Sequence, residues 1–419
     1  MVWDCAKNWN TLLYAGKRGR KRMILSSAFL AALLLLSGCG KESGRKTGGT
    51  DHPPKEGSER ITELSASESG SLIREESGGK EKPRTDFHLN EEPIAVNRGE
   101  QLTIGFSQIG AESDWRLASS ASMEQVFTSD NGYNLIFSDG QQKQENQIKA
   151  IREFIGQDVD YIILDPMTEY GWDSSLQEAK DAGIPVIIVD REVKVEDENL
   201  YTVWAGSDFR LEGDRACAWL EAYLETQPGL KDSKIGIVDV QGTLDASAQI
   251  GRSDALLEAV KKHENWELLA VECGDFVQAK GREVMEQMLK EYGSRINVVY
   301  CENDNMAYGV LEALENAGMK AGTDLSSGEV LVISFDAARQ GLEKTLQGEI
   351  AVDTECNPLY GPILSRIIMA LEQGDELPKR NYFEEKQFSS LDTVSEAVVN
   401  DSSYPVVMLT EELILGREY

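Results

Sequence analysis

Short apolar runs alternate with stretches of helical periodicity over residues 101–317. Runs of mostly apolar residues predict buried strands at 102–106, 134–137, 161–164, 185–189, 234–238, 266–271 and 296–300. Apolar residues at helical spacing predict helices at 115–127, 147–155, 176–182, 211–224, 246–260, 278–289 and 305–317. Strands that alternate with helices of this length predict parallel β-α-β units, and therefore an α/β fold.

The alternation falls into two series, and the second series begins at the strand 234–238. Two such series predict two similar lobes. The remaining pattern, a strand at 350–352, a helix at 360–371 and an extended segment at 404–408, is too small for a third domain. We therefore expect the chain to return to both lobes, with 99–208 and 337–384 in the N-terminal lobe and 209–336 and 385–419 in the C-terminal lobe.

Aspartates follow four of the apolar runs, namely Asp139, Asp165, Asp190 and Asp336. In an open α/β sheet, the last residues of the strands face the crevice where ligands bind. Four aspartates at such positions predict a polar cleft. Some of them, Asp165 first, could instead cap the helix that follows.

The loop after the first predicted strand carries a tryptophan and an arginine at the start of a helix. Trp115 is either a core residue or, beside Arg116 and facing Asp139, a plate on which a ligand ring stacks. We favour the second interpretation. The opposite lobe offers Thr243 and, on the next helix, Arg252. Carboxylates, amides, arginines and an aromatic face together suit a neutral ligand rich in hydroxyl groups.

The charge of the 419-residue chain disfavours several classes of function. Its formal net charge is −30, and residues 1–38 contribute six basic side chains and one aspartate, so the remainder is near −35. Nucleic acid needs a basic surface and is therefore a poor partner. The three histidines, His52, His88 and His263, give little support to histidine catalysis or a histidine metal site. No GxGxxG or Walker motif occurs, and we predict no enzyme activity, cofactor or metal.

The N-terminus has the order of a bacterial export signal. Residues 17–22 are rich in lysine and arginine, residues 23–36 are almost all apolar, and residues 36–39 are Leu-Ser-Gly-Cys. The apolar run is too short to cross a bilayer comfortably. Its end resembles the bacterial lipobox, in which the cysteine, here Cys39, is lipidated. We expect a signal peptide at 1–38 and a lipid-anchored protein outside the cytoplasm; the alternatives are an ordinary signal peptide and an uncleaved anchor.

Residues 39–98 are rich in Gly, Ser, Glu and Lys and poor in aromatic residues. Such a composition cannot bury enough apolar surface to offset the entropy lost on ordering, so we predict a disordered tether. A flexible chain of this length spans on the order of 40–45 Å. The folded part could then move over the membrane while it stays attached.

Several segments carry a resemblance to a known family. Residues 105–108, 139–150, 179–186, 190–191, 241–243 and 274–276 resemble the substrate-binding proteins of bacterial sugar ABC transporters, ribose-binding class, and within this class the galactofuranose-binding proteins. The resemblance covers about residue 101 to the C-terminus. It implies a periplasmic binding protein of type I: two Rossmann-like lobes with parallel sheets, joined by a three-segment hinge, which close on a sugar and present it to an ABC permease. It also implies a monomer.

The resemblance implies a role for residues at twelve positions. Trp115 would stack on the sugar, with Glu112 and Arg116 near it. The hydroxyl-binding residues would be Asp139, Gln142, Asp190 and Arg191 from the first lobe and Thr243, Arg252, Asn303, Asp336 and Glu355 from the second lobe and the hinge. The resemblance is looser at 244–248, 334–338 and 355–358, which border the ligand, so the sugar itself stays open among galactofuranose, another furanose or pentose, and a larger sugar.

Two other functions compete with transport. The closed form could signal through a membrane sensor kinase, which the sequence does not separate from feeding a permease. A glycosidase could use two cleft carboxylates such as Asp139 and Asp336, but nothing indicates the carboxylate spacing and raised pKa that this chemistry needs. A transcriptional regulator with the same lobes is disfavoured, because a signal peptide stands where its DNA-binding helices should be.

Four cysteines follow the predicted tether: Cys217, Cys273, Cys301 and Cys356. They form no CxxC pair, and their spacing does not reveal a disulfide. Cys217 lies on a predicted helix and Cys301 ends a predicted strand. We therefore expect buried thiols.

Overall fold

The computed structural model describes residues 93–96, 101–230 and 233–419 of the chain. The predicted signal peptide, Cys39 and all of the predicted tether except 93–96 lie outside the described residues. Residues 93–96 are docked on the first lobe, which the tether prediction did not anticipate. The Val96 amide donates to the Asn131 carbonyl at 2.8 Å, and the Tyr133 hydroxyl donates to the Ile94 carbonyl at 2.9 Å.

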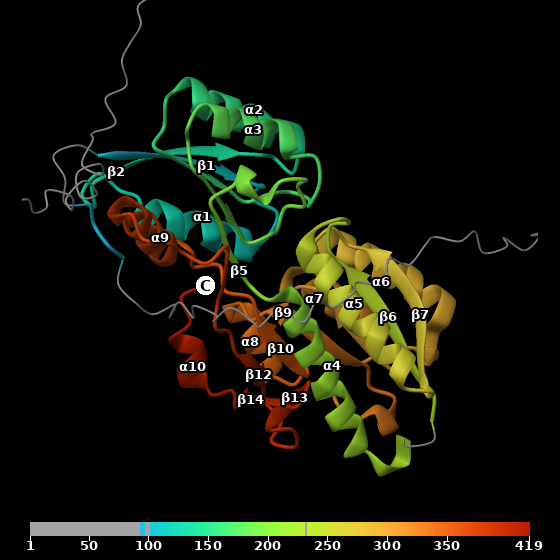
Figure 1. Cartoon of the computed structure of the whole chain (residues 1–419). Coiled ribbons are helices and arrows are strands. Elements are labelled where there is room, and N and C mark those ends of the chain that lie inside the picture. Colours follow the sequence, from blue (N-terminus) through green and yellow to red (C-terminus); the bar gives the residue numbers. More distant parts are fainter. Residues whose placement is uncertain (1–92, 97–100, 231–232) are drawn as a thin grey trace, which may run out of the picture. The chain divides into compact units, whose positions relative to one another are not determined.

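The first lobe is built on a six-stranded sheet whose described strands all pair in parallel, in the order β11-β5-β4-β3-β1-β2. The strands are β1 (Leu102–Gln108), β2 (Tyr133–Asp139), β3 (Tyr161–Leu164), β4 (Val186–Val189), β5 (Val203–Gly206) and β11 (Arg380–Tyr382). The helices are α1 (Asp114–Val126), α2 (Gln144–Gly156), α3 (Asp173–Asp181) and α9 (Gly361–Gln373), with the short η1 (Glu198–Leu200). Figure 1 shows α2 and α3 on one face of this sheet and α1 and α9 on the other.

The second lobe has an eight-stranded sheet in the order β13-β14-β12-β10-β9-β8-β6-β7. Its strands are β6 (Ile235–Gln241), β7 (Trp266–Cys273), β8 (Val298–Cys301), β9 (Leu331–Asp336), β10 (Val352–Glu355), β12 (Gln387–Ser389), β13 (Glu396–Val399) and β14 (Ser402–Met408). The pairs β10·β12 and β13·β14 are antiparallel, and the other pairs are parallel.

Helices cover the second sheet in packed pairs. They are α4 (Phe209–Glu225), α5 (Ser247–Lys262), α6 (Gln278–Tyr292), α7 (Asp304–Asn316), α8 (Arg339–Leu346) and α10 (Glu411–Leu415), with the short η2 (Pro228–Leu230), η3 (Gly293–Arg295) and η4 (Leu325–Ser327). Helix α4 packs on α5, and α6 packs on α7. In the part of the chain that the structure describes, no helix combines the length and the apolar character needed to cross a membrane.

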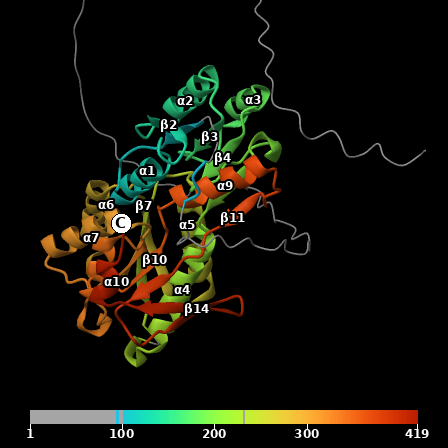
Figure 2. The same cartoon turned by 90° about the vertical axis from the view of Figure 1, so that its left-hand side faces the viewer.

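The chain passes between the lobes three times, after β5, after β10 and after β11. The predicted fold class, two α/β lobes with a three-segment hinge, is confirmed. The lobe boundary at 337 differs from the prediction, because β10 pairs with β9 and residues 337–355 therefore belong to the second lobe. Figure 2 shows β10 in the second lobe and α9 with β11 in the first. The crossing thus follows Glu355.

Buried strands form the core of each lobe, and their ends position the cleft. Ile104 and Phe106 on β1 and Val298 and Val299 on β8 are at most 1% exposed. Because helices cover both faces of the sheets, the inner strands β3, β4 and β8 are buried and apolar along their length. The edge strands β2 and β7 carry exposed residues, and the buried Asp239 lies within β6. All the elements predicted for residues 102–317 are present, with ends shifted by about three residues.

Candidate functional site

A cavity lies between the two lobes. Each lining residue lies in a loop that follows the carboxyl end of a strand or in the first turns of the next helix. The lining residues are Glu112, Ser113, Trp115, Arg116, Asp190, Arg191, Phe209, Ala248, Arg252, Phe276, Asn303, Asp336 and Cys356. This edge of the two sheets is where the strand-end aspartates predicted a cleft.

Eight of the twelve predicted binding residues line this cavity: Glu112, Trp115, Arg116, Asp190, Arg191, Arg252, Asn303 and Asp336. Asp139, Gln142, Thr243 and Glu355 do not. Sequence reasoning missed Ser113, Phe209, Ala248, Phe276 and Cys356 as lining residues. Phe276 lies within the segment 274–276, which carries part of the family resemblance. That resemblance could have pointed to Phe276 as a residue near the ligand.

The Asp139 stretch forms a turn outside the cavity. The exposed Asp139 carboxylate accepts from the Gln141 amide at 2.7 Å, an interaction that holds the chain reversal before α2. Gln142 is also exposed, with φ of 56°. Gln147, further along the same stretch, is fully buried and accepts from the Met167 amide at 2.9 Å, so it fixes the loop after β3. The stretch therefore shapes the first lobe.

The other two predicted residues also point to protein partners. The half-buried Thr243 hydroxyl lies 3.5 Å from the Asp275 carbonyl. Glu355 is buried, and its carboxylate accepts from Arg417 at 2.7 Å and from the Lys386 amide at 2.8 Å. The Glu355 side chain therefore binds other residues of the second lobe, next to the hinge, and does not line the cavity.

Arg116 is the centre of a buried charge network in the first lobe. Its Nε donates to Glu112 at 3.1 Å, and its Nη1 donates to Asp190 at 3.1 Å and also to Asp165. Asp165 is fully buried and pairs with this arginine, which replaces the helix-capping interpretation. Burial raises the pKa of Asp165 against the attraction of Arg116. Burial also opposes ionisation of Glu112, but Arg116 and Arg191 outweigh it and lower the pKa of Glu112.

Asp190 and Arg191 follow β4 and face the opposite lobe. Asp190 has φ of 60°, a left-handed conformation that turns its carboxylate into the cavity. The Tyr360 hydroxyl donates to this carboxylate at 3.3 Å. Arg191 donates to the Met167 carbonyl at 2.7 Å, and its guanidinium lies 5.3 Å from the centre of the Phe276 ring across the cleft.

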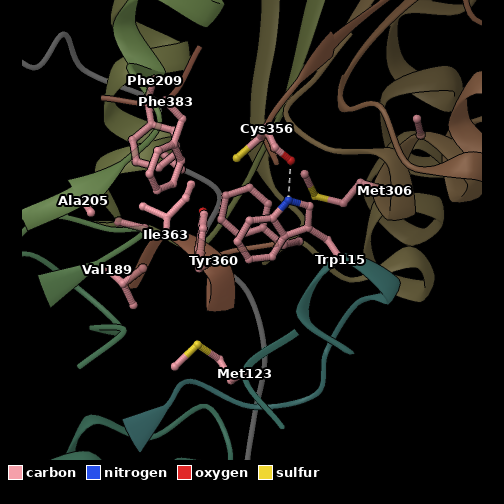
Figure 3. Packing of buried hydrophobic residues seen from close by; sticks show 14 of the residues in the cluster. Trp115, Met123, Val189, Ala205, Phe209, Met306, Cys356, Tyr360, Ile363 and Phe383 are labelled. Atoms are coloured by element: carbon pink, nitrogen blue, oxygen red, sulfur yellow. Dashed lines mark hydrogen bonds between the residues drawn. The ribbon is translucent and has the colours of Figure 1, made fainter. Parts of the chain in front are cut away.

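Trp115 was expected to be either a core residue or a plate on which a ligand ring stacks, and it has features of both. It is only 5% exposed, as a core residue would be, yet it lines the cavity. Its indole N–H donates to the Cys356 carbonyl at 2.6 Å, and Figure 3 shows the ring beside Tyr360, with the nitrogen directed at that oxygen. The Arg116 guanidinium lies 4.6 Å from the ring centre. The hydrogen bond and the arginine fix the ring plane, so that one face can cover a ligand.

Arg252 and Asp336 provide the charges of the second lobe. Arg252 donates to Glu212 at 2.8 Å and to the Glu302 carbonyl at 2.6 Å. Among the described residues, the Asp336 carboxylate has only Arg252 as a charged partner, at 3.9 Å. Burial raises the pKa of Asp336 well above its usual value, although Arg252 opposes this shift. This carboxylate therefore has unused hydrogen-bonding capacity that faces the cavity.

Asn303 caps α7 and also lines the cavity. Its side-chain oxygen accepts from the Met306 amide at 2.9 Å, and its amide nitrogen donates to the Phe276 carbonyl at 3.4 Å. The cap satisfies one of the free N–H groups at the helix start. It also holds the amide at the cavity wall.

Hydrogen bonds between described residues join the lobes around the cavity. The Asp114 amide donates to the Asn305 side chain at 3.3 Å, the Glu169 amide to the Asp245 carbonyl at 3.0 Å, and the Glu192 amide to the Ser247 hydroxyl at 2.9 Å. Each bond connects a loop or helix start of the first lobe with a loop or helix start of the second. The lobes are therefore closed over the cavity.

The cavity lining carries three basic and three acidic side chains. Arg116, Arg191 and Arg252 face Glu112, Asp190 and Asp336, and Trp115, Phe209 and Phe276 add ring surfaces. Behind the lining, Asp165 also pairs with Arg116 and Glu212 with Arg252, and a neutral polar ligand leaves these ion pairs intact. The arrangement can accept and donate many hydrogen bonds around a small ring with apolar C–H faces.

One group of side chains in the described part of the chain has the spacing of metal ligands. Ligand atoms of Glu212, Cys356 and Glu385 lie within 4.8 Å of one another near the hinge. Glu212 already binds Arg252, and Glu385 accepts from the Ser207 hydroxyl at 2.7 Å. The nearby guanidinium opposes a cation there, so this group does not suit a metal.

Residues 104–358, which include every lining residue of the cavity, match the family described as "Periplasmic binding protein domain". The chain is 39% identical to the galactofuranose-binding protein of Escherichia coli over 264 residues, which are 62% of this chain and 79% of that protein. The chain belongs to the periplasmic binding protein family. Membership confirms the predicted family, and it implies a location outside the cytoplasm.

Solved structures of similar proteins hold furanose sugars. A protein from Mycobacterium smegmatis in complex with β-D-fucofuranose has a TM-score of 0.64 and 38% identity, over 70% of this chain and 92% of that one. The binding protein of the arabinose ABC transporter of Shewanella sp. ANA-3, bound to α- and β-L-arabinofuranose, has a TM-score of 0.62 and 36% identity, over 68% and 90%. These relatives are binding proteins, which confirms the prediction that this periplasmic binding protein is not an enzyme.

The cysteines in the described residues are free thiols. Cys217, Cys301 and Cys356 are buried, as expected, and Cys273 is half-buried. Burial raises the pKa of each of these four thiols. They are therefore poor nucleophiles at neutral pH.

Proposed function

We propose that this protein captures a neutral monosaccharide in its furanose form, galactofuranose or a related furanose or pentose, between its two lobes. The proposal is based on the side chains that line the cavity, which include three arginines, three carboxyl groups and three aromatic rings. Sugars present hydroxyl groups at their edges and C–H groups on their faces. Such a lining meets both, because ionised groups form strong hydrogen bonds to hydroxyls and rings cover the C–H face.

The enclosure of the cavity supports a small ligand. Hydrogen bonds close the two lobes around it, so a single sugar ring suits the site better than a larger sugar. The furanose form is supported by relatives at 36–39% identity that are named for, or bound to, furanose sugars.

We further propose that the protein is anchored to the membrane by lipid on Cys39 and acts as a monomer that delivers its sugar to an ABC permease. The Leu-Ser-Gly-Cys order at 36–39 after an apolar segment supports the anchor. Permease delivery is supported by the relatives, one of which is the binding component of an arabinose ABC transporter. Closure on a sugar would give the permease a surface that only the loaded form presents.

A panel of neutral sugars tests the proposal through thermal unfolding. A ligand that binds only the folded state raises the midpoint of unfolding. We expect galactose, which contains a furanose fraction in solution, or arabinose or ribose to raise it, and charged sugar acids to leave it unchanged. A folded protein whose midpoint responds to a sugar acid, and to no neutral monosaccharide, would contradict the proposal.

A further inference from the structure

The turn that carries Asp336 has an unusual backbone. Asp336 ends β9 with φ of 102°, and Ala337 follows with φ of 53°. Residues other than glycine rarely adopt either conformation, because both strain the backbone. Such a turn persists only where its surroundings hold it. It is also what directs the Asp336 carboxylate into the cavity.

Three side chains bind the backbone of this turn. The Ala337 amide donates to Asp353 at 3.0 Å, and the Ala338 amide donates to Asp304 at 2.8 Å. The Ala337 carbonyl accepts from the Nε of Arg417 at 2.8 Å. The two aspartates come from β10 and α7 of the same lobe, whereas Arg417 reaches the turn from eighty residues further along the chain.

Arg417 is itself fixed on its other side. Its Nη1 donates to Glu355 at 2.7 Å, and the Tyr419 hydroxyl donates to the same carboxylate oxygen at 3.1 Å. The guanidinium lies 4.1 Å from the centre of the Tyr419 ring and 5.4 Å from that of Phe388. One planar group thus joins the buried Glu355 to the carbonyl of the turn. Lysine cannot make both bonds in this geometry.

We propose that Arg417 is a positioning residue of the sugar site, which it never touches. By holding the Ala337 carbonyl, it keeps the turn in its strained conformation and the Asp336 carboxylate in the cavity. The expected effect of Arg417 on sugar binding rests on the proposed function. Its expected effect on the backbone of the turn does not. Glu355, which the sequence placed at the ligand, acts here through Arg417.

A double-mutant cycle with Asp336 tests the inference. We expect Arg417→Met to weaken sugar binding about tenfold in the otherwise unchanged protein, and Arg417→Lys to have an intermediate effect. In an Asp336→Asn background, Arg417→Met should change the affinity less than about twofold, because the group that it positions is already altered. Arg282→Met is the matched control, since Arg282 pairs with Glu312 at 3.3 Å on the surface of the same lobe, away from the turn. It should leave the affinity unchanged.

Hydrogen exchange gives a readout that needs no sugar. If Arg417 holds the turn, the amides of Ala337 and Ala338 should exchange at least about tenfold faster in the Arg417→Met protein, and amides of the β1 core should not change. If Arg417→Met does not fold, Arg417→Lys is measured in the same way. Unchanged exchange at both amides would overturn the inference, and so would equal affinity losses in the two backgrounds. If the unsubstituted protein bound no sugar, the proposed function would fail, and the exchange rates alone would decide the role of Arg417.

Discussion

For single residues, the carboxyl groups that line the cavity differ in their partners between the lobes. Asp190 is held by Arg116 and the Tyr360 hydroxyl, whereas among the described residues Asp336 has only Arg252 as a charged partner, at 3.9 Å. A carboxylate with few protein partners has the most to gain from a ligand hydroxyl. Asp336 is therefore the residue at which a small chemical change should affect binding most.

We predict that Asp336→Asn weakens sugar binding roughly 10- to 100-fold, because asparagine offers one oxygen where the carboxyl group offers two, and a buried polar group left without its partner costs about 1–3 kcal/mol. Asp139→Asn is the control: it changes the carboxylate that the sequence favoured but that the structure places outside the cavity. It should leave affinity within about twofold. Calorimetric titration measures both, and a larger loss for the Asp139 variant would show that the cavity has been misassigned.

The buried carboxyl groups also make stability depend on pH. Burial, and then the neighbouring Asp336, raise the pKa of Asp353 to about 8 from its model-compound value of 3.8. The folded state then binds more protons than the unfolded state between these two pKa values, so the free energy of unfolding falls as pH rises from about 4 to about 8.

Asparagine at position 353 resembles the protonated aspartate and does not titrate. We predict that Asp353→Asn reduces this loss of stability with rising pH, measured by urea unfolding at pH 6 and pH 8.5. Its side-chain oxygen can still accept from the Ala337 amide, so the fold should be retained. An identical pH dependence in the two proteins would show that Asp353 is not the group responsible.

At the scale of elements, helices sit close to strands that end at the cavity. Gly105 on β1 faces Phe154 of α2, and an added Cβ would lie 2.5 Å from the Phe154 ring. Side chains in contact lie farther apart than this, so α2 or β1 would have to move. The close approach explains why a glycine stands at this position of the strand.

We predict that Gly105→Ala lowers the free energy of unfolding by about 1–3 kcal/mol through overpacking. Gly156→Ala, at the end of α2, is a matched control because nothing lies within 4 Å of its added Cβ. It should be neutral or slightly stabilising, since alanine favours the helix. Chemical denaturation distinguishes the two, and equal stabilities would mean that the β1–α2 packing is looser than described.

The elements show what the sequence could and could not predict. Alternating apolar runs and helical periodicity located most of the elements over 102–317, with β5 missed, because the inner strands are buried on both faces. The pattern did not reveal that 350–355 pairs with β9, since a register between distant strands is not a local property. Asp139 and Asp190 occupy similar sequence positions, yet only Asp190 meets an arginine and a cavity. Phe209 and Cys356 lie in the hinge crossings, whose path was not predictable from the residues alone.

At the scale of the whole molecule, function depends on how the two lobes close. Backbone amides of the first lobe donate to the side chains of Asn305 and Ser247 in the second. Neither residue lines the cavity. These bonds favour the closed state without regard to which sugar is inside, so they should set residence time more than specificity.

We predict that Ser247→Ala weakens binding of every accepted sugar by a similar factor, about 2- to 10-fold for one hydrogen bond, through faster dissociation. Ser326→Ala, an exposed serine on η4, should have no effect. Stopped-flow dissociation kinetics measure the change. A loss confined to one sugar would instead indicate that Ser247 contacts the ligand.

Calorimetric titration with two locked isomers tests whether the closed cavity holds a neutral furanose. Methyl galactofuranoside and methyl galactopyranoside have the same composition and cannot interconvert, so they differ only in ring form. We predict binding of one furanoside per protein molecule and much weaker or no binding of the pyranoside. Tighter binding of the pyranoside, or binding of neither by the folded protein when a charged sugar does bind, would contradict it.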